Sequence, residues 1–505
     1  SEPVEMKVDN NGEEEIWTID ATLCYNPVLG GQFADPDVDV FDGKFYIYPT
    51  TDGVEGWGGT QFHVFSSDDM IDWVDEGVIV DVADDNAGLN ENGVQIGTVP
   101  WSKGNAWAPT IEEKNGKYYY YFCAREKDTD KQAMGVAVSD SPTGPFVVKD
   151  EPIVNMADCA AEGISMGQTI DPSIFTDPDT GKSYMLFGNG NGAIVELTED
   201  MMDFVPGTMK NISGLRDFRE AVTITKRDGV YHLTWSCDDT GSENYHVNYG
   251  TSDSPYGPVN YQYTILQKDP ENDILGTGHH SILYMPETDE AYIVYAKFMT
   301  PLGQVTGGFG YHREVCIDKL TFDEETGLMN PVTPTLTGIT EPVKAPASEE
   351  EQMAAFQEVM PEVTAKADGS SVVVEWKSIE NAGSYRIYRK EAGGSFKGLA
   401  TVSADETSYV DETAQTGVTY YYTVKGFWEA DAQGVNTQYP TDVQVYVPIA
   451  EADFARVVPQ VSAKVNADKS VTVSWEEIKE AKSYRIYRKE AGGSFKGLTN
   501  AAAGT

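Results

Sequence analysis

A hairpin unit that recurs five times between residues 40 and 300 constrains the fold of this chain more than any other feature. Each unit opens with a tight turn and continues as a strand-like run rich in aromatic residues. The five copies begin at Asp42, Asn115, Thr180, Asp228 and Asp289. An Asp-Gly or Asn-Gly pair, which opens three of them, is a strong hairpin signal before alternating apolar residues. The chain is therefore predicted to consist mainly of short antiparallel strands.

A second element extends several of these units into a longer repeat. It is a Ser-Asp turn followed by another strand-like run, as at Ser67, Ser139 and Ser252. Because helical periodicity is almost absent, the two elements together predict an all-β fold whose first domain is a five-bladed β-propeller. A β-sandwich is the main alternative, but it does not repeat a hairpin and a turn five times. The propeller is predicted to span residues 22–340 and to close near Pro331–Thr335.

The pattern changes after the propeller. Residues 341–360 are predicted to be a linker with a short helix, because Ser348 and Glu351 form a capping box. Residues 361–449 resemble a fibronectin type III module, which is a small β-sandwich. Its strand tryptophan is Trp376, and Tyr420 is the candidate for its tyrosine corner.

A partial second copy of this module starts near Val457. Its segment Ser483–Leu498 repeats Ser384–Leu399 residue for residue, and the chain stops at Thr505 before any counterpart of Tyr420. Half a sandwich cannot bury its own faces, so residues 457–505 are predicted to be disordered or abnormally packed.

Composition restricts the class of partner. The chain carries 36 basic and 81 acidic residues, for a net charge of -45. Phosphate binding requires clusters of Lys and Arg, so nucleic acid and anionic membranes are disfavoured. Polyanionic substrates are disfavoured too, unless a local basic site overrides the overall charge. A neutral polysaccharide meets no such repulsion, and the 28 Tyr and 9 Trp suit sugar stacking as well as β-sheet cores.

Several other functional classes lack their sequence signals. The five cysteines are odd in number and show no CxxC spacing, so neither a zinc site nor a disulfide framework is expected. No apolar run reaches transmembrane length, so membrane insertion is not expected. The chain begins Ser-Glu-Pro, so any signal peptide is expected to have been left off, and the compartment has to be inferred from function.

Three carboxylates, Asp35, Asp171 and Glu220, lie in separate but similar contexts. Each follows a short stretch with apolar or aromatic residues and precedes a strand-like run. Cleavage of a glycosidic bond needs a pair of carboxylates with opposed pKa values, and a third can keep the pKa of the acid high. The three residues are therefore candidates for one catalytic centre.

Five short motifs around these carboxylates, in this order, resemble glycoside hydrolase family 43 over residues 22–340. The motifs are Ala34-Asp35-Pro36, Trp107-Ala108-Pro109, Ile170-Asp171-Pro172-Ser173, Arg219-Glu220-Ala221 and Gly276-Thr277-Gly278-His279-His280-Ser281. The resemblance implies a five-bladed propeller that hydrolyses glycosides with inversion. Ala221-Val222 departs from the Gly-Pro or Ala-Pro that often follows the family's acid, which weakens any subfamily assignment.

The resemblance also implies roles for individual residues. Asp35 matches the general base that activates water, and Glu220 matches the general acid. Asp171 matches the carboxylate that orients the acid and raises its pKa. Inversion implies a separation of ~6.5–9.5 Å between the carboxyl groups of base and acid.

Two further residues are assigned by the same resemblance. His279 matches a histidine that faces a metal, commonly Ca²⁺, through water on the propeller axis. Na⁺, water alone or a simply hydrogen-bonded histidine are the alternatives. Arg313 resembles an arginine that reaches the family's active centre, and the alternative is a surface salt bridge.

Four aromatic residues are candidates for contact with sugar. Phe33, Trp101 and Trp107 are predicted to stack on a ring, and Trp57, in a Gly-rich loop, to form the rim of the pocket. Burial in the core is the alternative for each of them.

The favoured function is that of a secreted or cell-surface bacterial glycoside hydrolase acting on neutral plant cell-wall polysaccharide or its oligosaccharides. Among family activities we favour an exo-acting α-L-arabinofuranosidase that also has β-xylosidase activity. Endo-1,5-α-L-arabinanase, β-galactofuranosidase and galactanase are alternatives, and a non-catalytic carbohydrate-binding propeller is the alternative from another class. No organic cofactor is expected, and the protein is expected to be a monomer.

Overall fold

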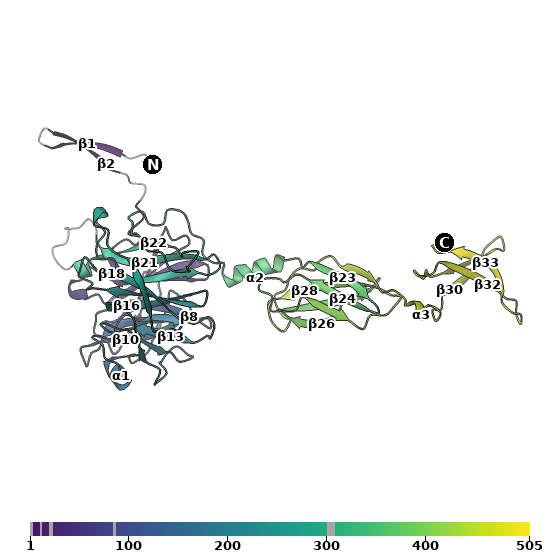
Figure 1. Cartoon of the computed structure of the whole chain (residues 1–505), viewed down its shortest axis with the longest axis horizontal. Helices are drawn as coiled ribbons and strands as arrows, with labels where there is room; N and C mark the ends of the chain where they lie inside the picture. Colours follow the sequence, from purple (N-terminus) through teal and green to yellow (C-terminus); the bar gives the residue numbers. More distant parts are fainter. Residues whose placement is uncertain (1–3, 11–12, 20–23, 84–86, 300–308, 505) are drawn as a thin grey trace. The chain divides into compact units, whose positions relative to one another are not determined.

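The computed structural model describes residues 4–10, 13–19, 24–83, 87–299 and 309–504 (Figure 1). These fall into two compact units, residues 1–347 and 348–505. Nearly all of the regular structure is β, which confirms the predicted fold class. No helix among the described residues is long and apolar enough to cross a membrane.

Five sheets follow one another along the first unit, each a meander of antiparallel strands. The first consists of β3 (Phe33–Phe41), β4 (Lys44–Thr51), β5 (Gln61–Ser67) and β6 (Val74–Asp81), with β7 (Gly97–Thr98) added in parallel. The second consists of β8 (Trp107–Lys114), β9 (Lys117–Arg125), β10 (Gln132–Ser139) and β11 (Val147–Val148), and the third of β12 (Ser173–Thr176), β13 (Ser183–Phe187), β14 (Ala193–Glu196) and β15 (Lys210–Asn211). The fourth consists of β16 (Phe218–Arg227), β17 (Val230–Cys237), β18 (His246–Ser252) and β19 (Asn260–Leu266), and the fifth of β20 (Gly278–Met285), β21 (Glu290–Phe298) and β22 (Arg313–Leu320).

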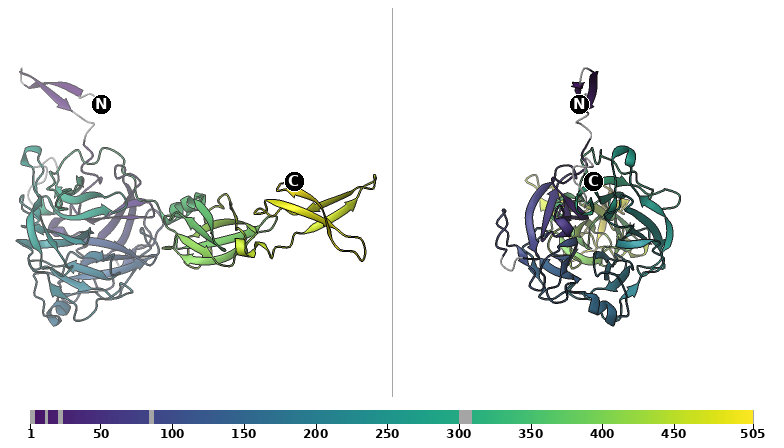
Figure 2. Two further views of the ribbon diagram at one scale, coloured as in Figure 1. Left: turned by 45° about the vertical axis from the view of Figure 1, so that its right-hand side comes forward. Right: turned by 90° about the vertical axis from the view of Figure 1, so that its left-hand side faces the viewer.

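The innermost strands of the five sheets form a closed ring, visible in the right-hand view of Figure 2. β3 contacts β8, β8 contacts β12, β12 contacts β16, β16 contacts β20, and β20 contacts β3. This is the arrangement of a five-bladed β-propeller. One end of every inner strand therefore lies on the same face of the ring. Residues far apart in sequence meet there.

The ring is closed by residues from its two ends in sequence. The Val28 backbone N–H donates to the Val315 carbonyl oxygen at 2.9 Å, and the Asn26 N–H donates to the Leu336 carbonyl at 3.1 Å. The Asn26 side chain both donates to and accepts from the backbone of Ile317. Closure thus involves the segment just beyond the predicted Pro331–Thr335.

The tyrosine-rich strand β9 shows why the blades are so aromatic. Tyr120 lies in the core shared with the first blade, and its neighbour Tyr121 lies in the core shared with the third. Side chains alternate between the two faces of a strand, and in a ring of blades both faces are covered. A middle strand is therefore apolar throughout rather than alternating with polar residues.

The second unit starts with the helix α2 (Glu349–Glu358), whose N-cap Ser348 forms the predicted capping box with Glu351. A β-sandwich follows. One sheet consists of β23 (Val363–Asp368), β24 (Ser371–Trp376) and β27 (Ser408–Asp411), and the other of β26 (Lys397–Ser403), β25 (Ser384–Glu391), β28 (Thr419–Phe427) and β29 (Val443–Tyr446). Trp376 and Tyr420 lie in its core, and the Tyr420 hydroxyl accepts a hydrogen bond from the Gln415 N–H. The fibronectin type III assignment stays a prediction.

Residues 457–505 form two separate hairpins. They are β30 (Val461–Val465) with β31 (Val471–Trp475), and β32 (Ser483–Arg488) with β33 (Lys496–Ala502). Apolar side chains such as Val465 (70% exposed) and Phe495 (64%) lie open to solvent. The predicted disorder or abnormal packing of these residues stays a prediction.

The other described elements include three 3-10 helices, η1 (Glu55–Trp57), η2 (Pro270–Asn272) and η3 (Phe309–Tyr311), and a few short strands and α-helices. These strands and α-helices are the hairpin β1 (Val4–Asn10) with β2 (Glu13–Ile19), the helix α1 (Met156–Ala161) and the helix α3 (Glu451–Phe454). The described cysteines form no disulfide, and all except Cys24 are buried.

Candidate active site

Each of the five inner strands has the same backbone irregularity at its first residues or just before them. One non-glycine residue there has a positive φ: 47° at Asp35, 39° at Ala108, 60° at Asp171, 54° at Ala221 and 40° at His279. In four of the sheets a register shift of a β-bulge accompanies it. Bulges redirect side chains, and left-handed non-glycine residues are uncommon and strained. The five sequence motifs thus share one backbone feature, a left-handed residue, and in four of them it lies at a β-bulge.

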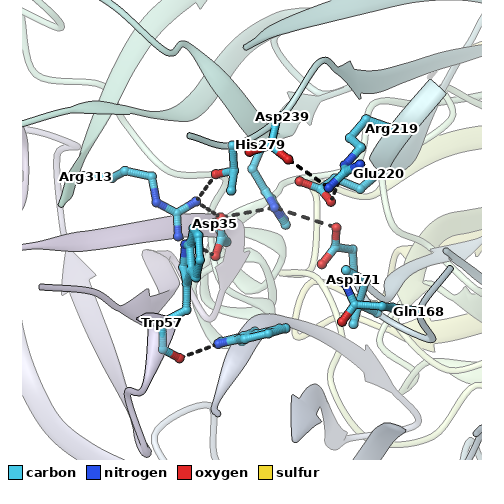
Figure 3. Close-up of a pocket in the computed structure, with 12 residues that line it drawn as sticks. Asp35, Trp57, Gln168, Asp171, Arg219, Glu220, Asp239, His279 and Arg313 are labelled. Atoms are coloured by element: carbon cyan, nitrogen blue, oxygen red, sulfur yellow. Dashed lines mark hydrogen bonds and ion pairs between the residues drawn. The ribbon is translucent and has the colours of Figure 1, made fainter. Parts of the chain in front are cut away.

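These bulges surround a pocket with a volume of about 300 Å³ (Figure 3). Seven of its twelve lining residues were predicted from the sequence, and every blade contributes at least one of them. The predicted seven are Asp35, Trp57, Trp107, Asp171, Glu220, His279 and Arg313; the others are Gln168, Ile170, Arg219, Asp239 and Thr240.

Asp35, in the first blade, is held by one positive and one neutral donor from the fifth blade. The Arg313 guanidinium donates to both of its carboxylate oxygens, at 2.6 and 3.2 Å, and His279 Nδ1 lies 3.1 Å from Oδ1. Burial raises the pKa of Asp35, but Arg313 and His279 together bring that pKa below its usual value. Burial lowers the pKa of His279, so its ring is neutral and donates. Asp35 is therefore a carboxylate at neutral pH.

Arg313 is itself oriented by a second carboxylate, Asp52. Asp52 accepts hydrogen bonds from the Arg313 backbone N–H at 3.1 Å and from Nε at 2.9 Å. Arg313 is only 3% exposed, so this is a buried ion-pair network rather than the surface salt bridge considered as the alternative. A planar guanidinium shared between two carboxylates has one orientation, which also determines the orientation of Asp35.

Glu220 has a different environment on the far side of the pocket. The Tyr245 hydroxyl donates to its Oε1 at 2.8 Å, and the Asn189 amide donates to its Oε2 at 2.7 Å. Both donors are neutral and buried. Burial raises the pKa of Glu220 above its usual value, although Tyr245, Arg219 and Asn189 all act to lower it. Glu220 can therefore hold a proton where Asp35 cannot.

Asp171 lies between the two, and its environment disfavours charge most strongly. Burial and the neighbouring Glu220 carboxylate raise the pKa of Asp171 well above its usual range. Among the described residues its Oδ2 has no hydrogen-bond partner, and it lies 3.9 Å from His279 Nδ1. Two carboxylates that interact in this way cannot both ionise readily.

Two glycines of the sequence motifs make room for the donors to Glu220. A Cβ on Gly278 would lie 2.3 Å from the Tyr245 ring, and a Cβ on Gly167 would lie 2.8 Å from Asn189 Oδ1. Because these residues have no side chain, Tyr245 and Asn189 can lie directly against the backbone. The motif glycines therefore support the acid through the groups that hold it.

Two tryptophans form a wall of the pocket. Trp107 Nε1 donates to the Trp57 carbonyl oxygen at 2.7 Å, and Trp57 Nε1 donates to the Gly310 carbonyl at 2.7 Å. A Cβ on Gly310 would lie 2.9 Å from the Trp57 ring and 3.0 Å from Gly241. Loops of the first, fourth and fifth blades thus pack together behind this wall.

Two of the predicted sugar-stacking residues lie elsewhere. Phe33 is 8% exposed and packs edge-on against Phe65, and Trp101 stacks on Phe122. In a regular strand Phe33 and Asp35 would face the same side, but the bulge between Ala34 and Asp37 breaks this alternation. Phe33 therefore belongs to the core, and Trp101 lies at the edge of another core.

The surroundings of His279 were tested for a cation. Ca²⁺ takes six to eight oxygen ligands. Among the described residues no group of three or more His, Cys, Asp and Glu side chains is arranged to hold a metal ion. A cavity of about 20 Å³ next to Asp171, His279 and Ser281 has room for about one water molecule. These side chains alone do not form a Ca²⁺ shell, so no catalytic step is assigned to a cation, and the predicted Ca²⁺ or Na⁺ stays a prediction.

Several site residues were missed from the sequence. Asn189 lies in the Gly188–Gly192 segment, whose glycines showed a turn but not its position beside the acid. Tyr245 and Asp52 had no local signal, because their partners are 25 and 261 residues away. Arg219 lies inside a recognised motif and Gln168 lies two residues before another, so both could have been named from their position.

The model of the family described as glycosyl hydrolases family 43 matches residues 24–327, which contain the whole ring of inner strands. The chain belongs to this family. It is a glycoside hydrolase.

Curated family members with related sequences carry several different names. A β-D-galactofuranosidase of Aspergillus niger is 33% identical over 339 residues, which cover 64% of this chain and 88% of the relative. A xylosidase/arabinosidase of Humicola insolens is 32% identical, covering 50% of this chain and 84% of the relative, and one of Bacteroides ovatus is 30% identical, covering 51% and 83%.

A solved structure supports the fold of the first unit. The crystal structure of a thermostable family-43 glycoside hydrolase matches with a TM-score of 0.50 at 25% identity, covering 62% of this chain and 96% of that one.

Proposed function

We propose that this family 43 enzyme is an inverting, exo-acting α-L-arabinofuranosidase that also accepts β-xylosides. The observation that carries the proposal is the opposite treatment of two buried carboxylates in one pocket. Arg313 and His279 keep Asp35 ionised, whereas burial keeps the pKa of Glu220 above its usual value in spite of its hydrogen-bond donors. Paired carboxyl groups with separated pKa values are what glycoside hydrolysis requires.

In the proposed reaction Asp35 is the general base and Glu220 the general acid. Asp35 takes a proton from a water molecule as that water attacks the anomeric carbon. Glu220 protonates the leaving glycosidic oxygen, and Asp171 disfavours the ionised form of Glu220 until the bond breaks. Asp35 and Glu220 come from the first and fourth blades, which are not neighbours in the ring. That separation supports a sugar and a water lying between them, as inversion requires.

Exo action is supported by the size of the pocket and by its tryptophan wall. A volume of about 300 Å³ is at the lower end of the range for small-molecule sites, which suits one or a few sugar rings. The wall of Trp57 and Trp107 is braced by Gly310 and Gly241. An endo-arabinanase would need an open groove that accepts chain on both sides of the cleaved bond.

β-D-Galactofuranosidase activity is the second candidate, and the 33% identical Aspergillus niger relative of that name favours it. α-L-Arabinofuranose and β-D-galactofuranose have the same ring configuration and differ in the length of the exocyclic chain. Asp35 and Glu220 would act identically on both sugars, so the choice depends on the space beyond the ring.

A substrate panel tests these proposals. Aryl α-L-arabinofuranoside, β-D-xyloside and β-D-galactofuranoside are compared with linear arabinan and arabinoxylan, and products are separated by size. Release of single arabinose units, with the first-formed anomer inverted by NMR, is the expected result. Mixed oligosaccharides from arabinan would contradict exo action, and a retained anomer would contradict the assigned role of Asp35. Binding of sugar with no turnover on any substrate would support a non-catalytic propeller instead.

Location and assembly are proposed from the same chemistry. A polysaccharide substrate supports a secreted or cell-surface position in a bacterium, and we propose that the protein acts there as a monomer without an organic cofactor. Cell fractionation and sedimentation at several protein concentrations test these points. Activity and melting temperature that are both unchanged after exhaustive chelation would contradict the predicted Ca²⁺ near His279.

A further inference from the structure

The internal repeat in the second unit is exact over one segment only. Ser384–Leu399 and Ser483–Leu498 are identical at all positions, whereas the thirteen residues before them differ at seven positions between the two copies. Core packing accounts for identity at inward positions such as Tyr385, which is 0% exposed. It does not account for identity at the positions that face solvent.

The repeated segment also concentrates positive charge in a strongly acidic chain. Eight of the chain's 36 basic residues lie in its two copies, and each copy contains a single acidic residue. Elsewhere acidic residues predominate, for a net charge of -45. The two copies are therefore local exceptions to the charge of the molecule.

On the outward face of β25 these cations alternate with aromatic rings. The Arg386 guanidinium lies 5.7 Å from the centre of the Tyr388 ring, and Lys390 Nζ lies 4.4 Å from that of Phe396. A Cβ on Gly398 would lie 2.8 Å from Arg386 Nε, so this glycine lets the Arg386 side chain lie over the neighbouring strand. We call Arg386, Tyr388, Lys390 and Phe396 the first strip.

The second copy repeats this arrangement. Arg485 lies 5.6 Å from the centre of the Tyr487 ring, and Lys489 Nζ lies 4.8 Å from that of Phe495. Gly497 stands beside Arg485 as Gly398 stands beside Arg386. These four residues form the second strip, with Tyr487 53% and Phe495 64% exposed.

The cations of the strips are only partly neutralised. Lys390 pairs with Asp442 at 2.6 Å. In the described part of the chain neither Arg386 nor Arg485 forms an ion pair with a carboxylate. Next to the first strip, Lys425 lies 4.0 Å from the centre of the Tyr439 ring, which is 56% exposed. The second strip thus offers exposed rings beside Arg485, whereas beside Arg386 the first strip offers half-buried rings together with the exposed neighbouring ring of Tyr439.

We propose that the two strips bind a polysaccharide that carries uronic acid carboxylates. A flat aromatic ring suits stacking on a sugar, and a guanidinium binds a carboxylate through paired hydrogen bonds. A membrane or a nucleic acid duplex would bring extended negative charge close to the acidic remainder of the protein. A single polysaccharide chain can contact a strip alone, and two identical strips allow bivalent binding.

This binding site lies outside the catalytic pocket, and its function does not depend on the proposed activity. The experiment uses the full chain with Glu220→Gln, so that the polymer stays intact. Its affinity for glucuronoxylan is compared with that for the same polymer after chemical reduction of its carboxyl groups. We expect tighter binding of the acidic polymer, weakened by high salt. Equal affinity for the two polymers, or no binding of the acidic one at low salt, would overturn the proposal.

Charge-matched variants locate the site. Arg386→Gln with Arg485→Gln is expected to weaken binding of glucuronoxylan by about tenfold, because each loses a charge-assisted pair. Lys366→Gln with Lys464→Gln removes the same charge from β23 and β30, and should leave affinity unchanged. Equal weakening by both pairs, or equally strong binding of anionic lipid vesicles, would contradict the proposal. Thermal unfolding of all variants shows that each is folded.

Discussion

Asp35 and Glu220 are nearly equally buried, at 6% and 7% exposure, yet the two sides of the pocket treat them in opposite ways. Asp35 lies against a buried guanidinium that a second carboxylate, Asp52, holds in place. Glu220 lies against a phenol and an amide, the Arg219 guanidinium is farther off at 3.6 Å, and burial outweighs all three so that the pKa of Glu220 is raised. Burial alone would raise the pKa of both carboxyl groups.

The difference shows that the partners, rather than the depth of burial, assign base and acid. A cation is worth more to a buried carboxylate than a neutral donor is, because the low local dielectric strengthens charge–charge attraction. The neutral donors still act on the acid. They stabilise Glu220 as it becomes negative, and so favour the transition state in which its proton is leaving.

The largest effect is expected from removing each carboxyl group in turn. Asp35→Asn and Glu220→Gln should each lower kcat by about 10²–10⁴-fold on natural linkages. On aryl glycosides with good leaving groups Glu220→Gln should lose much less, because such groups need little protonation. Asp35→Asn should lose equally on all leaving groups. Steady-state kinetics over an aryl series measures this, with Glu199→Gln as an exposed control, and equal leaving-group dependence in both variants would contradict the assignment.

Removing the Arg313 cation should make the environment of Asp35 resemble that of Glu220. Arg313→Gln should lower kcat/KM by about 10²-fold and move the acidic limb of the pH profile to higher pH. The sign follows from the roles: Asp35 works as the anion, Arg313 lowers its pKa, and without Arg313 that pKa rises. Asp52→Asn should move the acidic limb of the pH profile by a smaller amount. An acidic limb that does not move in Arg313→Gln would show that Asp35 is not the group that titrates there.

Removing the Tyr245 hydroxyl, which donates to Glu220, tests the environment of the acid. Tyr245→Phe should lower kcat by about tenfold on poor leaving groups and less on good ones. The basic limb should move to higher pH, because the lost hydrogen bond had lowered the pKa of Glu220. Tyr249→Phe is the matched control, since its hydroxyl bonds His232 in the same blade, outside the pocket. A rate loss independent of leaving group would indicate a purely structural role for Tyr245.

The smallest effect concerns stability. The raised pKa of Asp171 means that the folded protein resists its ionisation, so stability is lost as the pH rises from the unfolded pKa toward the folded one. Asp171→Asn should therefore raise Tm at neutral pH by about 2 °C while lowering activity. Calorimetry as a function of pH should show the gain growing with pH. Asp68→Asn, at an exposed carboxylate, should show no such gain, and a lower Tm in Asp171→Asn would contradict the assigned environment.

Much of the site could be predicted from the sequence because each motif has a local cause. Asp35, Asp171 and His279 stand out because a left-handed bulge residue before a strand needs a short, recognisable sequence. Phe33 and Trp101 were wrongly assigned to the pocket for a related reason. Phe33 precedes a bulge and Trp101 lies in a turn between two strands, and at neither place does the local sequence decide whether the ring faces the core or the pocket.

The sequence by itself determined the hairpin repeat, the all-β class, the order of the five motifs and the identity of the three carboxylates. These depend on turn residues and strand periodicity, which act between neighbours along the chain. Only the tertiary structure decided which partner each carboxylate meets. Asp35 meets an arginine 278 residues away, and Glu220 meets a tyrosine and an asparagine on separate strands or loops. Closing the ring places those groups together, and the charge or neutrality of each partner then separates the base from the acid.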